Sequence, residues 1–201
     1  MMRAATAAGH FEALYSAKPD PWNLATSPYE VAKYAATVAA LGGRHFRQGM
    51  EVGCAIGTLT RQLAPHCDAL LGIDLVEAPL ADARARCAEF PHVRFERMTI
   101  PDEWPAGQFD LIVLSEVIYF LSLDDLSLLA ARCTAAVEPG GMVMLVNWLG
   151  PNDGTMSGEA AAQSLLALLD GWACDNVMIE RDYRIDIAIR GVSDQGLLQR
   201  R

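Results

Sequence analysis

The sequence lacks the residue patterns that mark disulfide-bonded and metal-binding proteins. Its five cysteines are widely spread and form no C-x-x-C pair, so neither a disulfide framework nor a zinc site is indicated. The histidines are dispersed without an acidic partner at ligand spacing, and we expect no metal centre. This cysteine usage fits a reducing, cytoplasmic location.

Long apolar runs and surplus positive charge are also missing. The most apolar runs, 111–114 and 142–146, have the length of strands, whereas a membrane helix needs roughly 20 apolar residues. Residues 1–16 lack the apolar core of a signal peptide. The net charge of −9 opposes binding to phosphate backbones, which requires an excess of Lys and Arg. We therefore expect neither a membrane nor a nucleic-acid partner.

What is present is the pattern of one α/β domain over residues 1–201, with 52% hydrophobic and 20% charged residues. Strand-like and helix-like segments alternate from residue 46 to 148, which predicts a mostly parallel sheet with helices on both faces. Segments 177–180 and 183–189 alternate apolar and polar residues and predict an antiparallel hairpin at the end of a seven-stranded sheet.

The two ends of the chain are predicted separately. Residues 6–16 and 28–41 read as two helices, divided by a segment with two prolines. Because they precede the first strand, we expect residues 1–45 to form a helical cap over the open side of the sheet. The polar segment 191–201 is expected to be a frayed tail.

A glycine loop, Glu51-Val-Gly53-Cys54-Ala55-Ile-Gly57, follows the first strand and leads into a helix. Glycines at such a turn let the backbone pass close to a ligand. The third glycine of the dinucleotide fingerprint is missing. Glu51 would repel a pyrophosphate but attract a sulfonium or an ammonium group, and S-adenosylmethionine (SAM) carries both. The alternative is an ordinary strand–turn–helix.

A second strand, 70–74, ends in Asp74 about twenty residues after the first, where doubly wound sheets place an acid against the ribose hydroxyls of a nucleoside. An Asp at a strand end is otherwise often a helix cap, and Pro79 at the start of the next helix is compatible with that role.

These motifs resemble a known family. Glu51 to Gly57, Asp74 and the runs 109–120 and 138–141 look like the motifs of class I SAM-dependent methyltransferases. The runs Asp20-Pro-Trp-Asn-Leu24, Pro28-Tyr-Glu30 and Leu63-Ala-Pro-His-Cys67 narrow the resemblance to the NodS family of nodulation N-methyltransferases. The resemblance covers roughly residues 10–145. It implies a Rossmann-like fold, SAM as cofactor with S-adenosylhomocysteine (SAH) as product, and a small-molecule amine acceptor such as a de-N-acetylated amino sugar or chitooligosaccharide.

The cofactor contacts follow from the glycine loop, the strand ends and the resemblance. Tyr29 and Lys33 share one helical face, where Lys33 either meets the methionyl carboxylate of SAM or is a solvated surface residue. In the adenine turn, 98–102, the family often has an Asp; here Thr99, Asp102 or backbone alone must serve. The predicted cofactor-binding residues are Tyr29, Lys33, Glu51, Gly53, Cys54, Ala55, Gly57, Asp74, Leu75, Thr99, Ile100 and Ser115.

The catalytic candidates come from the fourth strand, 110–114, whose uninterrupted apolar run predicts a central position. Its carboxyl end leads to Glu116 and Tyr119 in the binding crevice. Glu116 is predicted to accept a proton from the amine and Tyr119 to orient its lone pair; the alternatives are capping and packing. Trp22, Tyr119 and Trp148 are the predicted substrate-binding residues; the alternative for Trp22 is that it plugs the core beneath its loop.

Other functions remain open at this point. One is an O- or N-methyltransferase of secondary metabolism, since segment 147–157 departs from the family pattern and would line the acceptor pocket. A second is an NAD-dependent oxidoreductase, which the missing third glycine opposes. A third is a non-catalytic SAM-binding module. The sequence does not indicate an oligomeric state.

Overall fold

The computed structural model describes residues 4–191, so the tail predicted at 191–201 lies outside the described residues except for Gly191. The helices are α1 (Ala4–Ala17), α2 (Pro28–Ala39), α3 (Thr58–Leu63), α4 (Ala78–Arg86), α5 (Leu123–Ala136) and α6 (Gly158–Leu168), with short 3-10 turns η1 (Ala64–His66) and η2 (Ile118–Phe120). The strands are β1 (Phe46–Val52), β2 (Cys67–Asp74), β3 (Val93–Arg97), β4 (Phe109–Ser115), β5 (Val137–Trp148), β6 (Ala173–Ile179) and β7 (Tyr183–Ile189).

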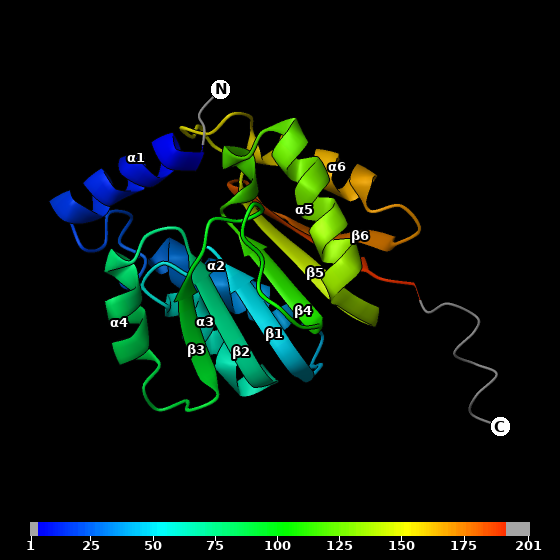
Figure 1. Ribbon diagram of the computed structural model, residues 1–201, viewed down its shortest axis with the longest axis horizontal. Helices are drawn as coiled ribbons and strands as arrows, with labels where there is room; N and C mark the ends of the chain where they lie inside the picture. Colours follow the sequence, from blue (N-terminus) through cyan, green and yellow to red (C-terminus); the bar gives the residue numbers. More distant parts are fainter. Residues whose placement is uncertain (1–3, 192–201) are drawn as a thin grey trace.

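The strands form one sheet in the order β3-β2-β1-β4-β5-β7-β6 (Figure 1). The five strands β1 to β5 pair in parallel, whereas β7 runs antiparallel to both β5 and β6. The expected seven-stranded sheet with a carboxy-terminal antiparallel hairpin is therefore confirmed.

Strand β4 lies at the centre of the sheet and is buried on both faces, as its apolar run predicts. Ile112 and Leu114 belong to the apolar core beneath α5 and α6. Leu111 and Val113 point to the opposite face and pack with residues of α2 and α3. All four are fully buried. Helices thus cover both faces of the sheet (Figure 1).

Several element boundaries differ from the prediction. β5 begins at Val137 rather than 142, because Gly140 adopts a φ of 81° and residues 140 and 141 exchange backbone hydrogen bonds with Arg190. A register shift against β4 accommodates the extra residues. β6 begins at Ala173 rather than 177, since pairing with β7 continues through residues that do not alternate in polarity.

The parallel strands bring their carboxyl ends to one edge of the sheet, where β1, β2 and β4 each lead into a loop. Residues of α1 and α2 line the cavity at this edge. Helix α2 begins with Ser27 as its N-cap and Pro28 in its first turn. Within residues 4–191, no helix has both the length and the apolar character to cross a membrane.

Candidate active site

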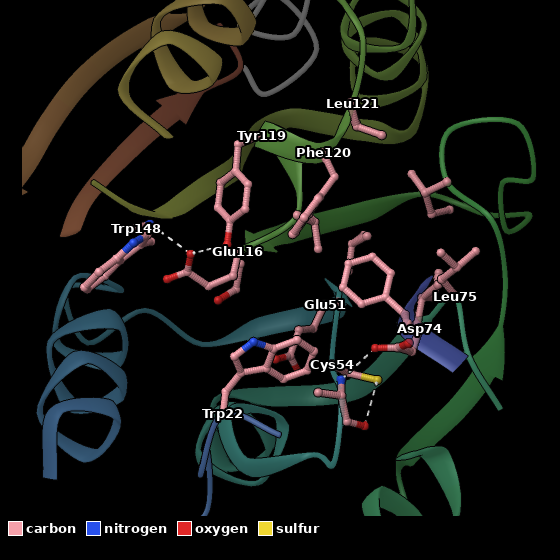
Figure 2. Close-up of a pocket in the computed structure, with 18 of the residues that line it drawn as sticks. Trp22, Glu51, Cys54, Asp74, Leu75, Glu116, Tyr119, Phe120, Leu121 and Trp148 are labelled. Atoms are coloured by element: carbon pink, nitrogen blue, oxygen red, sulfur yellow. Dashed lines mark hydrogen bonds between the residues drawn. The ribbon is translucent and has the colours of Figure 1, made fainter. Parts of the chain in front are cut away.

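A cavity of about 1220 Å³ lies at the carboxyl ends of the central strands, between the strand loops and the amino-terminal helices. Every residue predicted to bind cofactor or acceptor lines it except Gly57. Figure 2 shows Glu51, Cys54 and Asp74 on one side of the cavity, and Glu116, Tyr119 and Trp148 on the other. The fold therefore brings together residues that are up to 126 positions apart, Trp22 and Trp148 being the extremes.

The glycine loop is held close to the loop after β4. Gly53 has a φ of 82°, and a Cβ atom there would lie 2.3 Å from Val117 Cγ1 and 3.0 Å from the Ser115 carbonyl oxygen. Only glycine fits both the conformation and the space. The Gly53 and Cys54 amides both donate to the Ile73 carbonyl, at 2.8 and 3.0 Å, which ties the loop to the end of β2.

Gly57 has a different role from the predicted one. It precedes α3 with a φ of 76°, and a Cβ atom there would lie 2.9 Å from Ala83 Cα. The second glycine of the loop therefore allows α3 and α4 to pack closely, while Gly53 is the glycine that faces the cavity.

Glu51 is a buried acid that faces the cavity without a counter-charge. It is 1% exposed, and its Oε2 atom has no hydrogen-bond partner among the residues that the structure describes. Burial raises the pKa of Glu51 to about 7. An unpaired buried carboxylate is costly, and a cationic ligand would supply the missing partner.

Asp74 joins the end of β2 to the glycine loop. Its Oδ2 atom accepts from the Ala55 amide and its Oδ1 atom from the Val76 amide, both at 2.9 Å. Burial raises the pKa of Asp74 to about 6, and the backbone hydrogen bonds oppose this rise. Asp74 does not cap the next helix, because α4 begins at Ala78 after Glu77. Each oxygen keeps a lone pair for a further donor such as a ribose hydroxyl.

The turn after β3 contributes its backbone and apolar side chains to the cavity. Met98, Thr99, Ile100 and Asp102 all line the cavity, as does Leu75 after β2. The Thr99 amide donates to the Glu103 carboxylate at 2.6 Å, so this turn is fixed by a residue that the sequence did not single out.

Glu116 is the centre of a hydrogen-bond network at the end of β4. Its backbone is in the left-handed region, with a φ of 59°, which is strained for a residue with a Cβ atom. The Tyr119 hydroxyl donates to Glu116 Oε2 at 3.0 Å, and the Trp148 amide donates to the same oxygen at 2.8 Å (Figure 2). Burial and the nearby Glu116 carboxylate raise the pKa of Tyr119, so its hydroxyl stays a donor.

Lys33 reaches this network from α2. Its Nζ atom lies 2.7 Å from Glu116 Oε1 and 3.1 Å from Glu30 Oε1, and the residue is 2% exposed. Of the two alternatives for Lys33, the solvated surface residue is therefore wrong. In the sequence Glu30 stood out only as part of the run Pro28-Tyr-Glu30; its spacing of three residues from Lys33 was the available signal for this pair.

Aromatic residues of α1 and the following loop cover another part of the cavity. Trp22 is 43% exposed, so it does not plug the core. Its ring lies 5.6 Å from that of Tyr15 and 6.2 Å from that of Phe11, centre to centre. Phe11 in turn contacts Phe120 of η2 edge-on at 5.0 Å. Sequence reasoning missed Phe11, Tyr15 and Phe120, because their aromatic spacing is equally typical of a buried helix face.

Trp148 is fixed beside Glu116 by contacts on three sides. Its indole Nε1 donates to the Pro151 carbonyl at 3.0 Å, and its ring packs edge-on against Tyr29 at 5.6 Å. A Cβ atom at position 150 would lie 2.3 Å from the Trp148 ring, so glycine is required there. The ring is thus held as part of the cavity wall.

The comparisons with known proteins agree with this geometry. The family model for nodulation protein S (NodS) matches residues 13–138. Nodulation protein S of Rhizobium tropici is 28% identical over 155 residues, which cover 76% of this chain and 65% of that protein. Across four curated NodS relatives, the match spans between 49% and 72% of their length.

Two solved methyltransferase structures are similar to this chain. A methyltransferase from Pseudomonas syringae, described as putative, is 35% identical with a TM-score of 0.69, and the match covers 81% of this chain and 99% of that one. The N-methyltransferase NodS from Bradyrhizobium japonicum, in complex with SAH, is 24% identical with a TM-score of 0.75, covering 90% and 97% of the two chains. The family model spans well over half of the chain, and the chain belongs to the nodulation protein S (NodS) family.

Proposed function

We propose that this protein is a SAM-dependent N-methyltransferase that acts on the free amine of a small molecule. The main observation behind the proposal is that the cavity contains two acidic residues in different environments. Glu51 is buried with an unpaired oxygen, as a site for a cationic cofactor requires, whereas Glu116 is hydrogen-bonded and borders the acceptor side. The family membership of the chain supports the same activity.

The residues on the cofactor side fit SAM. Glu51 would face the positive charge of the cofactor, and the free lone pairs of Asp74 would accept from the ribose hydroxyls. Gly53 leaves room beside Cys54 and Ala55, and Leu75, Thr99, Ile100 and Ser115 would enclose the nucleoside. When bound, SAM supplies a methyl group on a positively charged sulfur, which leaves with the electrons of the carbon–sulfur bond.

The residues on the acceptor side position an amine. Glu116 would accept the proton that the amine must lose to expose its lone pair, and the Tyr119 hydroxyl would keep the carboxylate in place. Little further acid–base chemistry is needed, because methyl transfer depends mainly on alignment and on a dry site. The mutual contacts of Phe11, Trp22 and Phe120 in the cavity lining support the exclusion of water.

The acceptor that we propose is a de-N-acetylated amino sugar or chitooligosaccharide. Trp148 and Tyr29 form an aromatic wall next to Glu116, which suits the apolar face of a sugar ring whose amine points to the carboxylate. We also propose that residues 1–201 act as one domain in the cytoplasm; the five cysteines, all free and four of them buried, support a reducing location.

The test is incubation of the purified protein with isotopically labelled SAM and a panel of amines and alcohols. The panel would contain glucosamine, de-N-acetylated chitooligosaccharides, alkyl amines and small phenols, with product mass and fragmentation identifying the modified atom. Methylation of a nitrogen on an amino sugar is the expected result. Methylation of oxygen alone would establish the O-methyltransferase alternative, and SAM binding with no product from any acceptor would favour a non-catalytic module.

A further inference from the structure

Lys33 holds together two carboxylates that come from distant parts of the chain. Glu30 lies three residues earlier on α2, whereas Glu116 lies 83 residues later, at the end of β4. The Nζ atom is within hydrogen-bond distance of both, at 3.1 and 2.7 Å. This buried lysine is therefore the link between the amino-terminal helical cap and the proposed catalytic acid.

The orientation of Glu116 depends on this link. One carboxylate oxygen is held by the Tyr119 hydroxyl and the Trp148 amide, and the other by Lys33. Without Lys33, the second oxygen would have no fixed donor among these contacts, and the strained backbone of Glu116 would have one fewer interaction to hold it.

The charge of the network is not balanced. One lysine faces two glutamates, which leaves a net charge of −1 when all three are ionised. The remaining charged residues of the cavity do not correct this, since its lining holds five aspartates and three glutamates against Lys33 and His10. A cation that enters beside Glu116 would bring the network to neutrality.

A carboxylate ligand would have the opposite effect. If Lys33 bound the methionyl carboxylate of the cofactor, its ammonium group, which is almost fully buried, would face three carboxylates. The spacing of Tyr29 and Lys33 on α2 allowed such a contact, but it carried no information about Glu116, which lies beside Lys33. The geometry assigns the lysine to the acceptor side instead.

We propose that Lys33 is a positioning residue that holds Glu116 for proton transfer, and that Glu30 supplies the surplus negative charge that selects a protonated amine as the acceptor. This inference rests on the proposed N-methyltransferase function and specifies its acceptor as a cation. The acceptor would enter as R–NH₃⁺ and give one proton to Glu116, leaving R–NH₂. Its lone pair would form the nitrogen–carbon bond while the carbon–sulfur pair stays on sulfur. Glu116 would then release its proton to solvent.

The pH dependence of this step involves the charged and titratable groups that face Glu116. Burial raises the pKa of Tyr29 and of Tyr34, with Glu116 contributing in both cases, so these groups stay neutral. Substitutions at Glu30 and Lys33 therefore change the charge of this network without changing that of the two tyrosines. The groups around Glu116 are Tyr29, Glu30, Lys33 and Tyr34 of α2 and Tyr119 of η2, and Tyr34 also faces Glu51 of β1.

The test measures binding and turnover separately in Lys33→Met, Lys33→Arg and Glu30→Gln. Titration calorimetry with saturating SAH would compare glucosamine, de-N-acetylated chitobiose and putrescine with their N-acetylated counterparts. We expect the wild-type protein to bind at least one amine ten times more tightly than its acetylated counterpart, and Glu30→Gln to lose about tenfold in that preference. Equal binding of both forms, or no binding of any amine, would overturn the assignment.

The role of Lys33 is tested by comparing the binding of SAH and amine with the rate of methyl transfer. Lys33→Met should bind SAH within threefold of wild type and the amine at least as tightly as wild type, because loss of the lysine increases the surplus negative charge. It should nevertheless transfer the methyl group at least ten times more slowly, with partial recovery in Lys33→Arg. Loss of more than tenfold in SAH affinity would instead place Lys33 on the cofactor carboxylate and overturn the proposal, as would an unchanged rate.

Two matched controls separate these effects from general damage. Arg94→Met and Glu12→Gln remove one charge of each sign at exposed positions that do not line the cavity, and should leave every value unchanged. Thermal unfolding of each variant shows whether it is folded. Failure of this inference is distinct from failure of the proposed function, because in the first case the wild-type protein binds SAH without preferring charged amines, and in the second it does not bind SAH.

Discussion

Gly53 and Val117 hold the loops after β1 and β4 in contact at the floor of the cavity. A Cβ atom on Gly53 would lie 2.3 Å from Val117 Cγ1, well inside van der Waals contact. The backbone of Gly53 has a φ of 82°, a conformation that residues with a Cβ atom rarely adopt. The width of the cofactor side of the cavity therefore depends on the absence of one side chain.

Replacement of Gly53 by Ala should push the two loops apart. We expect the free energy of unfolding to fall by about 1–3 kcal/mol and SAH affinity to fall at least tenfold, because the strained φ and the overlap act together. Chemical denaturation and titration calorimetry measure the two effects. Gly43→Ala is the matched control: its φ is 73°, but a Cβ atom there meets nothing within 4 Å. An equal loss of SAH affinity in both variants would contradict the steric argument.

Glu51→Gln should weaken SAM binding by tenfold or more while leaving the protein folded. The amide has nearly the same shape but lacks the negative charge that faces the cavity, and a buried carboxylate without a partner does not stabilise the unliganded protein. Calorimetry with SAM and thermal unfolding would show the two results. Glu96→Gln, at an exposed position of β3, is the control. Unchanged SAM affinity would rule out an ionic role for Glu51.

The stability of the unliganded protein should fall as the pH rises from about 5 to 8. The pKa of Glu51 is raised from 4.5 to about 7 and that of Asp74 from 3.8 to about 6, both mainly by burial. The folded state therefore binds these protons more tightly than the unfolded state does. The resulting contribution to stability is fully present at a pH below the pKa values of the unfolded state, and it is lost as the pH rises through the pKa values of the folded state. For Glu51 alone the effect is about 3 kcal/mol at most. Urea unfolding at pH 5 and pH 8 would show a smaller difference in Glu51→Gln; an identical pH dependence would contradict this account.

Tyr119→Phe should slow methyl transfer without loss of cofactor affinity. The phenyl ring keeps the packing of Tyr119, but the hydroxyl that donates to Glu116 Oε2 is removed. We expect a decrease in kcat of between about ten and a hundredfold and SAH affinity within threefold of wild type. Tyr183→Phe is the control, since its hydroxyl contacts the Met178 sulfur. A normal kcat in Tyr119→Phe would limit Tyr119 to packing.

The cofactor half of the cavity could be anticipated from the sequence because its features are local. Gly53 follows β1 and Asp74 ends β2, and parallel strands place such residues at one edge of the sheet. The central position of β4 followed from its apolar run in the same way. These predictions needed only strand ends and their order.

The acceptor half could not be anticipated in the same detail, since it depends on how α2 lies over the sheet. The contact between Lys33 and Glu116 joins residues 83 positions apart, and the pattern of α2 does not specify which residue its lysine meets. The start of β6 was missed for a related reason: pairing with β7 extends it through Ala173 to Asn176, where hydrophobic alternation gives no signal.

The most direct test of the whole account is titration calorimetry of the wild-type protein with SAH and, separately, with NAD, repeated on Asp74→Asn. We predict that one SAH binds per chain, that NAD gives no measurable heat, and that Asp74→Asn binds SAH at least ten times more weakly. Tight binding of NAD with no heat from SAH would contradict the assignment of this cavity to SAM.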